Sequence, residues 1–283
     1  PLFYYVVYIF AKTFRSLPDE TSMRLSSSFA ALITLIAFFL TIRVGFGLSR
    51  SIASVVILGL TPLFYWQARY LQVDMVFSAA LVLALLAFFR FIENARTGWY
   101  YAFFIMLACA FMTKGPLAAV LAVPVVVFSC LSEKRMPAIL TRHTIFGILV
   151  FLAIIVPWYC AVYLKEGYPY LYENILRQNF LRFFEAWSHK RPFYYYFTTL
   201  PLDFFPWSLF LPLGLYTAFK TWKADKRTRF FLIWFLWFFF FLSLSSGKIS
   251  KYMLPALPAL AVIVSGSMRE LDRPYNKIVF PVA

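Results

Sequence analysis

The sequence predicts an all-helical protein that crosses a membrane many times, and three observations lead to this prediction. Hydrophobic residues make up 62% of the 283 positions, whereas charged residues make up only 14%. The mean hydropathy is +0.75, which is far above that of a soluble domain of this length. The apolar residues also form stretches that approach the roughly 20 residues of a membrane-spanning helix. The fold class is therefore a polytopic transmembrane helical bundle.

The predicted elements begin with a short aromatic stretch. Pro1–Phe14 is too short for a full crossing, so we expect an interfacial or re-entrant helix there. Nine predicted spans follow, and a tenth begins near Ile278: Leu25–Ile42, Ser51–Leu71, Met75–Ile92, Trp99–Thr113, Pro116–Leu131, Ile145–Leu164, Pro201–Phe219, Phe230–Ser246 and Tyr252–Met268.

These elements divide the chain into four segments. Residues 1–24 form an interfacial segment, residues 25–164 and 201–283 form transmembrane helices, and residues 165–200 form a loop that we expect to hold an amphipathic helix. The chain starts at Pro1 without Met and stops inside an apolar run. We therefore expect a fragment that is truncated at its C-terminus.

Charge is divided unevenly between the two faces that alternating connections create. One face carries 15 basic and five acidic residues, whereas the other carries 12 basic and seven acidic residues. By the positive-inside rule the first face is cytoplasmic, and the 165–200 loop is extracytoplasmic.

The net charge of +15 does not indicate nucleic-acid binding, because the basic residues lie in short clusters between apolar spans. The spacing of the three cysteines matches no metal-binding motif, so we expect them to be packing residues: Cys109, Cys130 and Cys160. The sequence contains no Gly-rich nucleotide loop and no nucleophile elbow.

Ionisable residues nevertheless interrupt the apolar chain at the outer ends of several spans. They are Arg69 and Asp74, Lys114, the run Arg177–Arg191, and Lys248 with Lys251. A charge at membrane depth costs a few kcal/mol and is retained where it faces a cavity or a partner. We therefore predict a polar site on this face.

The first part of this predicted site lies between the second and fifth spans. Asp74 has almost no loop around it, and it binds a sugar hydroxyl, orients a base or pairs with Arg69. Lys114 lies in the turn Thr113–Pro116, where backbone amides and an ammonium suit an anion. The alternative for Lys114 is a side chain that snorkels at a helix end.

The second part of the predicted site has a similar combination of cationic and polar groups further along the chain. The stretch Ser245–Tyr252 carries Lys248 and Lys251 with hydroxyl groups and the Tyr252 phenol. Two such turns on one side favour a phosphate site more than either turn alone.

The long loop supplies three more candidates. If its start is helical, Glu173, Arg177 and Arg182 share a face of an amphipathic surface segment. His189 has no visible partner, so we treat it as a binding candidate and not as a base.

Several short motifs occur in one order along the chain. They are Pro1–Tyr5, which resembles the end of a Lys-Pro-Pro-Leu-Phe-Tyr motif; Arg24–Leu25; Asp74–Met75; Thr113–Pro116; Asn179–Phe183 with His189, Pro192 and Tyr194–Tyr196; and Ser246–Lys248 with Tyr252. On these motifs the sequence resembles the bacterial GT-C membrane glycosyltransferases, the family of protein O-mannosyltransferases and of aminoarabinose transferases that modify lipid A.

The resemblance implies an enzyme of the bacterial inner membrane with its active site on the extracytoplasmic side. It would transfer a sugar from a polyprenyl-phosphate carrier to an acceptor on lipid A, a glycan or a protein hydroxyl. Asp74 would play a supporting catalytic role, and cationic and polar groups would bind the lipid phosphate, whose charge grows in the transition state. These binding candidates are Arg69, Lys114, Arg177, Arg182, His189, Lys248, Lys251 and Tyr252.

Two departures from the family pattern limit what the chain should do alone. The principal acidic residue of the family is expected upstream of Pro1, so the fragment by itself should be inactive. Some relatives carry a metal-binding Glu-His pair where this chain has Gln178 and Asn179. We therefore assign no metal ligand and name no cofactor, and a divalent metal is a disfavoured alternative.

Two other functions fit parts of the pattern. A transporter or flippase also has charges and broken helices at membrane depth, but we find no internal repeat of the kind that such proteins contain. A ligase for lipid-linked sugars would share the charged pocket and differ in its acceptor.

Overall fold

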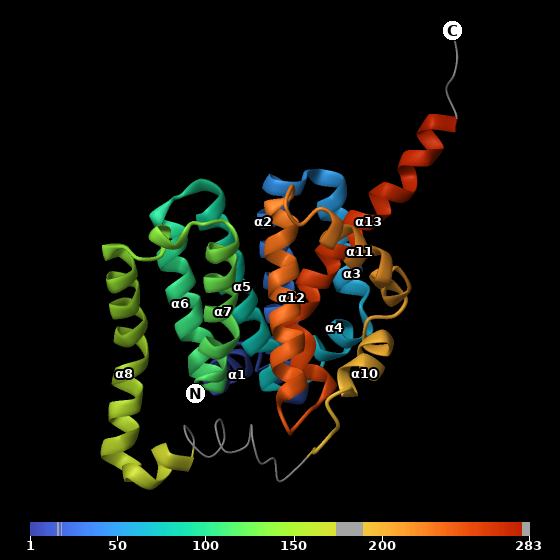
Figure 1. Ribbon diagram of the computed structural model, residues 1–283. Helices are drawn as coiled ribbons and strands as arrows, with labels where there is room; N and C mark the ends of the chain where they lie inside the picture. Colours follow the sequence, from blue (N-terminus) through green and yellow to red (C-terminus); the bar gives the residue numbers. More distant parts are fainter. Residues whose placement is uncertain (16, 18, 174–188, 279–283) are drawn as a thin grey trace.

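The computed structural model describes residues 1–15, 17, 19–173 and 189–278 and has a helical architecture (Figure 1). In this part of the chain every regular element is a helix, as predicted. The elements are α1 (Leu2–Thr13), α2 (Asp19–Phe46), α3 (Leu48–Leu60), α4 (Pro62–Gln67), α5 (Val73–Asn94), α6 (Thr97–Lys114), α7 (Leu117–Ser132), η1 (Met136–Ala138), α8 (Arg142–Leu171), α10 (Tyr195–Asp203), η3 (Trp207–Phe210), α11 (Leu211–Lys220), α12 (Lys226–Leu244), η4 (Ser250–Ala256) and α13 (Leu257–Ile278).

The long helices lie side by side, and their connections alternate between two ends of the bundle (Figure 1). We call the end with connections 43–50, 94–97, 133–142 and 220–227 the basic end. The end with connections 67–73, 114–117 and 245–251 is the pocket end, where α1 and α10 also lie. This alternation agrees with the division of connections predicted from the sequence.

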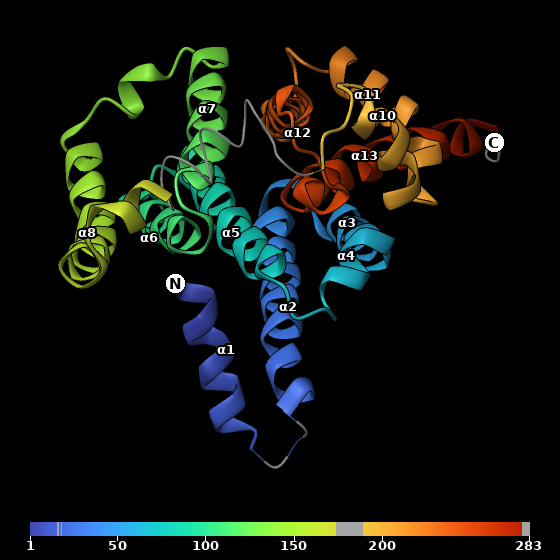
Figure 2. The same cartoon turned by 90° about the horizontal axis from the view of Figure 1, so that it is seen from below.

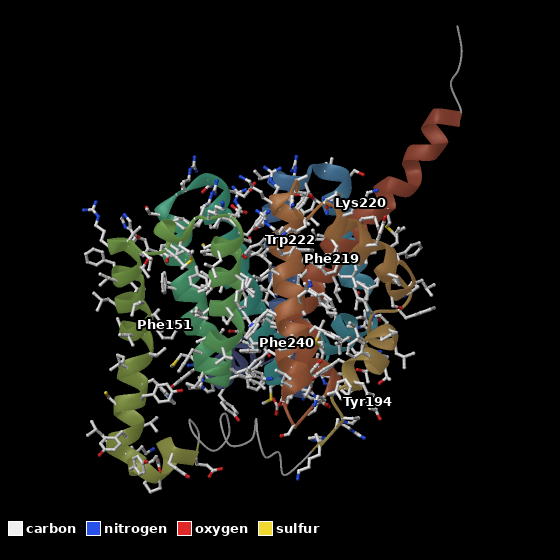
Figure 3. All side chains as sticks on the ribbon, viewed as in Figure 1. Phe151, Tyr194, Phe219, Lys220, Trp222 and Phe240 are labelled. Carbon is white, nitrogen blue, oxygen red and sulfur yellow. The ribbon has the colours of Figure 1, made fainter. Side chains whose placement is uncertain are left out.

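Five of the described helices are long and apolar enough to cross a membrane, which makes this a multi-pass membrane protein. They are Asp19–Phe46, Val73–Asn94, Arg142–Pro169, Lys226–Leu244 and Ser250–Met268. Many large apolar side chains on their outer surfaces are exposed, including Phe240 on α12 and Tyr194 at the pocket end (Figure 3). Such rings match the apolar interior and the headgroup boundary of a bilayer.

Two predicted spans are broken in the structure, and proline explains both breaks. The span at 51–71 is two helices, because Thr61 is extended before Pro62, which starts α4. The span at 201–219 is divided between α10, η3 and α11, with Pro206 directly before η3 and Pro212 near the start of α11. A proline lacks the backbone N–H that a continuous helix needs.

α5 is the central helix, with α6, α7 and α8 on one side and α3, α12 and α13 on the other (Figure 2). Most of its side chains are buried, and the rings of Phe88 and Phe89 pack against Phe230 of α12 at 6.4 and 5.2 Å between centroids. α8 lies at the periphery against α6, where Phe104 occupies the space that a side chain at Gly147 would need. Its remaining surface is largely exposed.

Candidate functional site

The centre of the candidate site is Asp74, in the first turn of α5, which is only 3% exposed. Its Oδ1 accepts a hydrogen bond from Nζ of Lys114, the last residue of α6. Its Oδ2 lies 3.0 Å from Nζ of Lys251, in the first turn of η4. Three segments far apart in sequence therefore meet at one carboxylate.

This arrangement excludes one of the three alternatives that the sequence left open for Asp74. Pairing with Arg69 is wrong, because the ion pairs of Asp74 in the structure are with Lys114 and Lys251. The Arg69 guanidinium lies 4.0 Å from the centre of the Tyr65 ring. Arg69 is therefore an exposed residue just after α4 and does not belong to the cluster around Asp74.

Lys114 is held at the rim of this cluster by the end of its helix. Gly115 has φ +65°, which lets the chain leave α6 directly after the lysine. The ammonium lies 5.1 Å from the ring centres of both Phe77 and Tyr252. Its aliphatic stem and charge are thus confined between two rings and a carboxylate, so the snorkelling alternative does not describe it.

The described contacts of this cluster bring two ammonium groups to one carboxylate. Lys251 also donates to Oε1 of Gln72 at 3.2 Å, so it contacts a neutral amide as well as Asp74. Ammonium groups held together in this way attract an anion, and the attraction is stronger where water is partly excluded.

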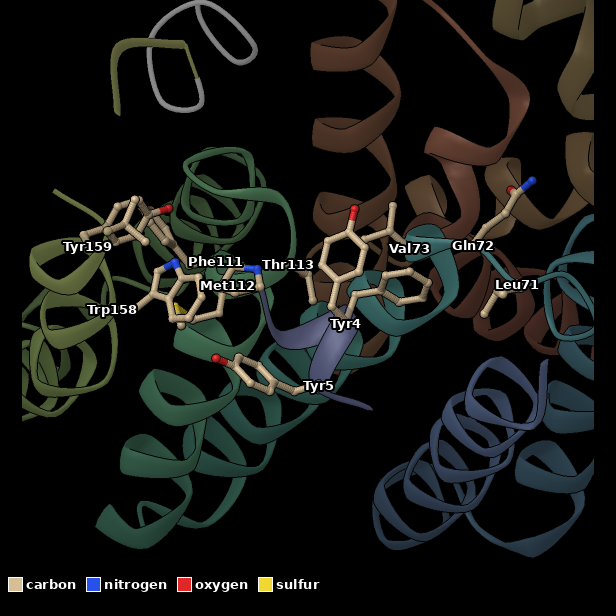
Figure 4. Close-up of a pocket in the computed structure, with 13 residues that line it drawn as sticks. Tyr4, Tyr5, Leu71, Gln72, Val73, Phe111, Met112, Thr113, Trp158 and Tyr159 are labelled. Atoms are coloured by element: carbon tan, nitrogen blue, oxygen red, sulfur yellow. The ribbon is translucent and has the colours of Figure 1, made fainter. Parts of the chain in front are cut away.

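A cavity of about 850 Å³ opens beside the cluster (Figure 4). Gln72, Val73 and Thr113 line one part of its wall, and they are the neighbours of Asp74 and Lys114 in the chain. Aromatic side chains from α1, α6 and α8 line the rest: Phe3, Tyr4, Tyr5, Phe111, Trp158 and Tyr159. The cavity therefore combines a broad aromatic wall with a polar part, whose residues adjoin Asp74 and Lys114 in the chain.

A second hollow of about 510 Å³ continues from this cavity along α8. Phe111 and Tyr159 line both spaces. The other lining residues are all on α8: Ile155, Val156, Cys160, Tyr163 and Leu164. The second hollow is thus an apolar groove that leads to the mixed cavity.

Lys248 lies in the connection before η4, but its ammonium is directed into that connection. Nζ donates to the carbonyl oxygen of Arg191 at 3.1 Å and to the carbonyl oxygen of Ser245. The residue is 3% exposed, and this burial lowers the pKa of the ammonium. Lys248 therefore stabilises the loop, and the structure does not bring it to Asp74.

The remaining predicted residues are placed as follows. The side chain of His189 is exposed, and its carbonyl oxygen accepts from the backbone N–H of Lys248 at 3.0 Å. Arg177 and Arg182 lie outside the described residues, as do Gln178 and Asn179. Within the described part of the chain, no group of three or more His, Cys, Asp or Glu side chains could hold a metal ion.

Sequence reasoning missed several residues that complete the site. Gln72 directly precedes the Val73–Asp74 pair, and Trp158 faces Tyr5 across the cavity at 5.8 Å between ring centres. Neither carries a charge, so neither differs from the many neutral and aromatic residues of the chain.

Comparison with known proteins shows which family the chain resembles. Residues 1–160 match the family described as dolichyl-phosphate-mannose-protein mannosyltransferase. An uncharacterised protein of Aquifex aeolicus is 26% identical over 94% of this chain and 52% of its own length. An undecaprenyl phosphate-alpha-4-amino-4-deoxy-L-arabinose arabinosyl transferase of Pseudomonas fluorescens is 30% identical over 89% of this chain and 43% of its own length.

Among solved structures, the fold is similar to ArnT from Cupriavidus metallidurans. The crystal structure of that protein bound to undecaprenyl phosphate has a TM-score of 0.84 and 20% sequence identity, covering 98% of this chain and 51% of ArnT. Its apo structure gives a TM-score of 0.81 at 23% identity, covering 98% of this chain and 50% of ArnT. The chain thus spans about half the length of these proteins and has their GT-C fold.

Proposed function

Because the chain belongs to the dolichyl-phosphate-mannose-protein mannosyltransferase family, we propose that the protein is a membrane glycosyltransferase. It transfers a sugar from a polyprenyl-phosphate carrier to an extracytoplasmic acceptor. The names of the relatives support this proposal, since the protein from Pseudomonas fluorescens is named as a transferase of an amino sugar from undecaprenyl phosphate. ArnT from Cupriavidus metallidurans crystallised with undecaprenyl phosphate.

The observation that carries the proposal is the sharing of one buried carboxylate between Lys114 and Lys251 at the margin of the cavity. Breaking the bond between a sugar and a polyprenyl phosphate leaves negative charge on the phosphate oxygen. Preorganised cations beside that oxygen stabilise the charge as it develops, which lowers the barrier to transfer. Lys114 and Lys251 supply such cations, and the centre of the Tyr252 ring lies 5.1 Å from the Lys114 ammonium.

Asp74 has a supporting role in this proposal. Both of its carboxylate oxygens are occupied by lysine ammonium groups, so it holds the two cations in place and does not act as a base. The acceptor would then be activated by another residue, in agreement with the expectation from the family resemblance. Arg177, Arg182 and His189 remain predicted phosphate ligands.

The apolar groove along α8 supports a lipid donor. A polyprenyl phosphate has a long hydrocarbon chain and an anionic head, and a matching site needs an apolar channel that ends at cations. The groove lined by Ile155, Val156 and Cys160 leads into the cavity beside Gln72. We assign the groove to the prenyl chain and the margin near Lys251 to the phosphate.

The distribution of charge supports an extracytoplasmic site. Plain basic runs such as Lys220–Arg229 occur at the basic end, and the positive-inside rule puts such runs in the cytoplasm. The pocket end would then face the opposite side of the membrane, where the acceptor is a lipid, a glycan or a protein hydroxyl. In a bacterium this is the inner membrane, with the site toward the periplasm.

The proposal is tested by supplying the complete protein, in membranes, with defined polyprenyl-phosphate sugars and detecting the radiolabelled product. We expect Lys251→Met to raise the KM for the donor by about 10- to 100-fold, because a hydrogen bond to a charged group is lost. Lys223→Met, at the basic end, makes the same change in charge on an exposed residue and should leave the KM unchanged.

Three outcomes would count against the proposal. The first is transfer from soluble nucleotide sugars alone. The second is equal effects of Lys251→Met and Lys223→Met. The third is movement of the lipid-linked sugar across vesicles without transfer, which would support a flippase.

A further inference from the structure

Gln72 connects the cavity to the cluster around Asp74. The residue is half-buried and lines the cavity of about 850 Å³. Its Oε1 accepts a hydrogen bond from Nζ of Lys251 at 3.2 Å, and the same ammonium lies 3.0 Å from Oδ2 of Asp74. The side chain therefore contacts a cation of the candidate site and also forms part of the cavity wall.

The position of Gln72 at the start of α5 leaves its side chain available for this contact. Gln72 is the N-cap residue of α5, with an extended backbone at φ −141° and ψ 147°, and its side chain caps none of the described N–H groups of that helix. Its backbone N–H donates to the carbonyl oxygen of Tyr70 at 2.9 Å. Short side chains such as Asp, Asn and Ser usually cap a helix, because they reach its first turn. The longer carboxamide of Gln72 instead reaches η4, 179 positions away in the sequence.

The contact with Lys251 decides which donors of the carboxamide are left for a ligand. An ammonium has only donors, so the amide atom that faces it must be the oxygen. The donors left on Gln72 are therefore the two N–H bonds of its NH2 group. Among the hydrogen bonds of the described residues, none uses this NH2 group. Because Gln72 lines the cavity, a ligand bound there can accept a hydrogen bond from it.

The order of the lining residues indicates which part of a lipid would meet Gln72. Figure 4 shows Gln72 at one end of the lining residues and Trp158 with Tyr159 at the other end. Tyr159 also lines the apolar groove along α8, which we assigned to the prenyl chain. A lipid whose chain occupies the groove therefore brings its polar head toward Gln72 and Lys251.

We propose that Gln72 binds the donor directly: its NH2 group donates a hydrogen bond to an oxygen of the sugar-phosphate head, while Lys251 holds its carbonyl oxygen. This inference rests on the proposed function, because it assumes that the cavity binds a polyprenyl-phosphate sugar. The acceptor is a phosphate oxygen or a sugar hydroxyl, since both accept hydrogen bonds from an N–H group. The lysine orients the amide, and the amide extends the binding site from the cation into the cavity.

Two substitutions separate donation to the lipid from holding Lys251. Gln72→Met removes the carboxamide at similar size, whereas Gln72→Glu keeps an oxygen for Lys251 and replaces the NH2 group by an acceptor. We expect each to raise the donor KM of the complete protein by about tenfold, as for one lost hydrogen bond. Asn94→Asp makes the same amide-to-carboxylate change on an exposed residue of the basic end and should leave the KM unchanged. If Gln72→Glu has the KM of the unaltered protein, Gln72 only positions Lys251 and the inference is wrong.

A double-mutant cycle with Lys251→Met excludes an indirect effect through the lysine. A residue that acts only by holding Lys251 has no further effect once that ammonium is gone. A residue that contacts the donor still loses its own hydrogen bond, so Gln72→Met should raise the KM again, several-fold, in the Lys251→Met background. An unchanged KM in that background would overturn the inference. Thermal unfolding in detergent is the folding control, and Gln72→Glu takes the place of Gln72→Met in the cycle if the latter lowers the transition temperature.

Binding measured without an acceptor separates this inference from the proposed function and identifies the oxygen. The probes are undecaprenyl phosphate alone and a polyprenyl-phosphate sugar, each titrated into the complete protein in detergent. Weaker binding of both probes to Gln72→Met indicates a phosphate oxygen, and weaker binding of only the sugar-bearing probe indicates a sugar hydroxyl. If the unaltered protein transfers no sugar while Gln72→Met still weakens probe binding, the proposed function fails and the role of Gln72 stands. Equal affinities of the two proteins for both probes would refute that role whatever the transfer assay shows.

Discussion

Both ends of the helical bundle contain buried ion pairs, but the two ends use their cations differently. At the basic end, Arg229 pairs with Glu133 at 3.5 Å, and both side chains are less than 10% exposed. Arg229 also donates to the carbonyl oxygen of Trp222 at 3.0 Å. At the pocket end, Lys114 and Lys251 share one carboxylate beside a large cavity.

Arginine and lysine account for much of this difference. The guanidinium of Arg50 donates to the Thr228 hydroxyl at 3.0 Å and to the carbonyl oxygen of Val262 at 3.1 Å, so it joins α3 to α12 and α13. Arg135 similarly donates to the carbonyl oxygen of Ile92 at 2.9 Å. A planar group with five N–H donors can satisfy several fixed acceptors at once, whereas an ammonium is a compact charge on a flexible stem. The arginines of the basic end therefore hold helices together, whereas the lysines of the pocket end are suited to binding a ligand.

The largest effect that tests this comparison is expected from Asp74→Asn. The substitution leaves two ammonium groups close together without the carboxylate, and removing one partner of a buried ion pair costs about 3–5 kcal/mol. The transition temperature of the protein in detergent should fall sharply, and donor transfer should be lost. A stable Asp74→Asn variant would show that the pocket-end cations do not depend on this carboxylate.

A smaller effect is expected from Glu133→Gln at the basic end. Its distance to Arg229 is 3.5 Å, longer than the contacts at Asp74, so we expect a loss of about 1–3 kcal/mol in the free energy of unfolding. The donor KM should stay unchanged because this end is not part of the site. Measuring thermal unfolding and donor KM on the same preparation checks both statements. A raised KM would show that the basic end also contributes to donor binding.

The smallest effect is expected from Arg69→Ala, which tests whether a cation of the pocket end outside the Asp74 cluster contributes to donor binding. The guanidinium lies over the Tyr65 ring, and an exposed contact of this kind contributes about 0.5–1 kcal/mol. Thermal unfolding should therefore shift only slightly. Donor KM decides whether Arg69 also binds phosphate: the sequence predicts an increase, whereas its separation from Asp74 predicts none.

Much of the fold could be predicted from the sequence, because the length of an apolar stretch is a local property of the chain. The helices at α2, α5 and α12 agree with predicted spans to within a few residues at most of their ends. Predictions were weakest where proline divides an apolar run, as at Pro62 and Pro206, since hydropathy does not register a missing N–H group. The boundary predicted at 164 also falls inside α8, which continues to Leu171 through a kink at Gly167.

The candidate site was predicted in part. Asp74, Lys114, Lys251 and Tyr252 are brought together as the sequence indicated, because each lies at a helix end on the same face. Lys248 shares the signature of Lys251 but points into its own loop. Two lysines three positions apart in a turn can face opposite directions, and only the backbone conformation decides which one reaches Asp74.

The sequence by itself determined that this is a helical membrane protein with a cationic face, because hydropathy and charge follow directly from composition and spacing. Only the tertiary structure decided which cations share Asp74, that Arg69 does not, and that an aromatic cavity lies beside them. These contacts join α5, α6 and η4, which are separated by up to 177 positions between Asp74 and Lys251. Pairing over such distances depends on how helices pack, and that information is not carried by any local pattern.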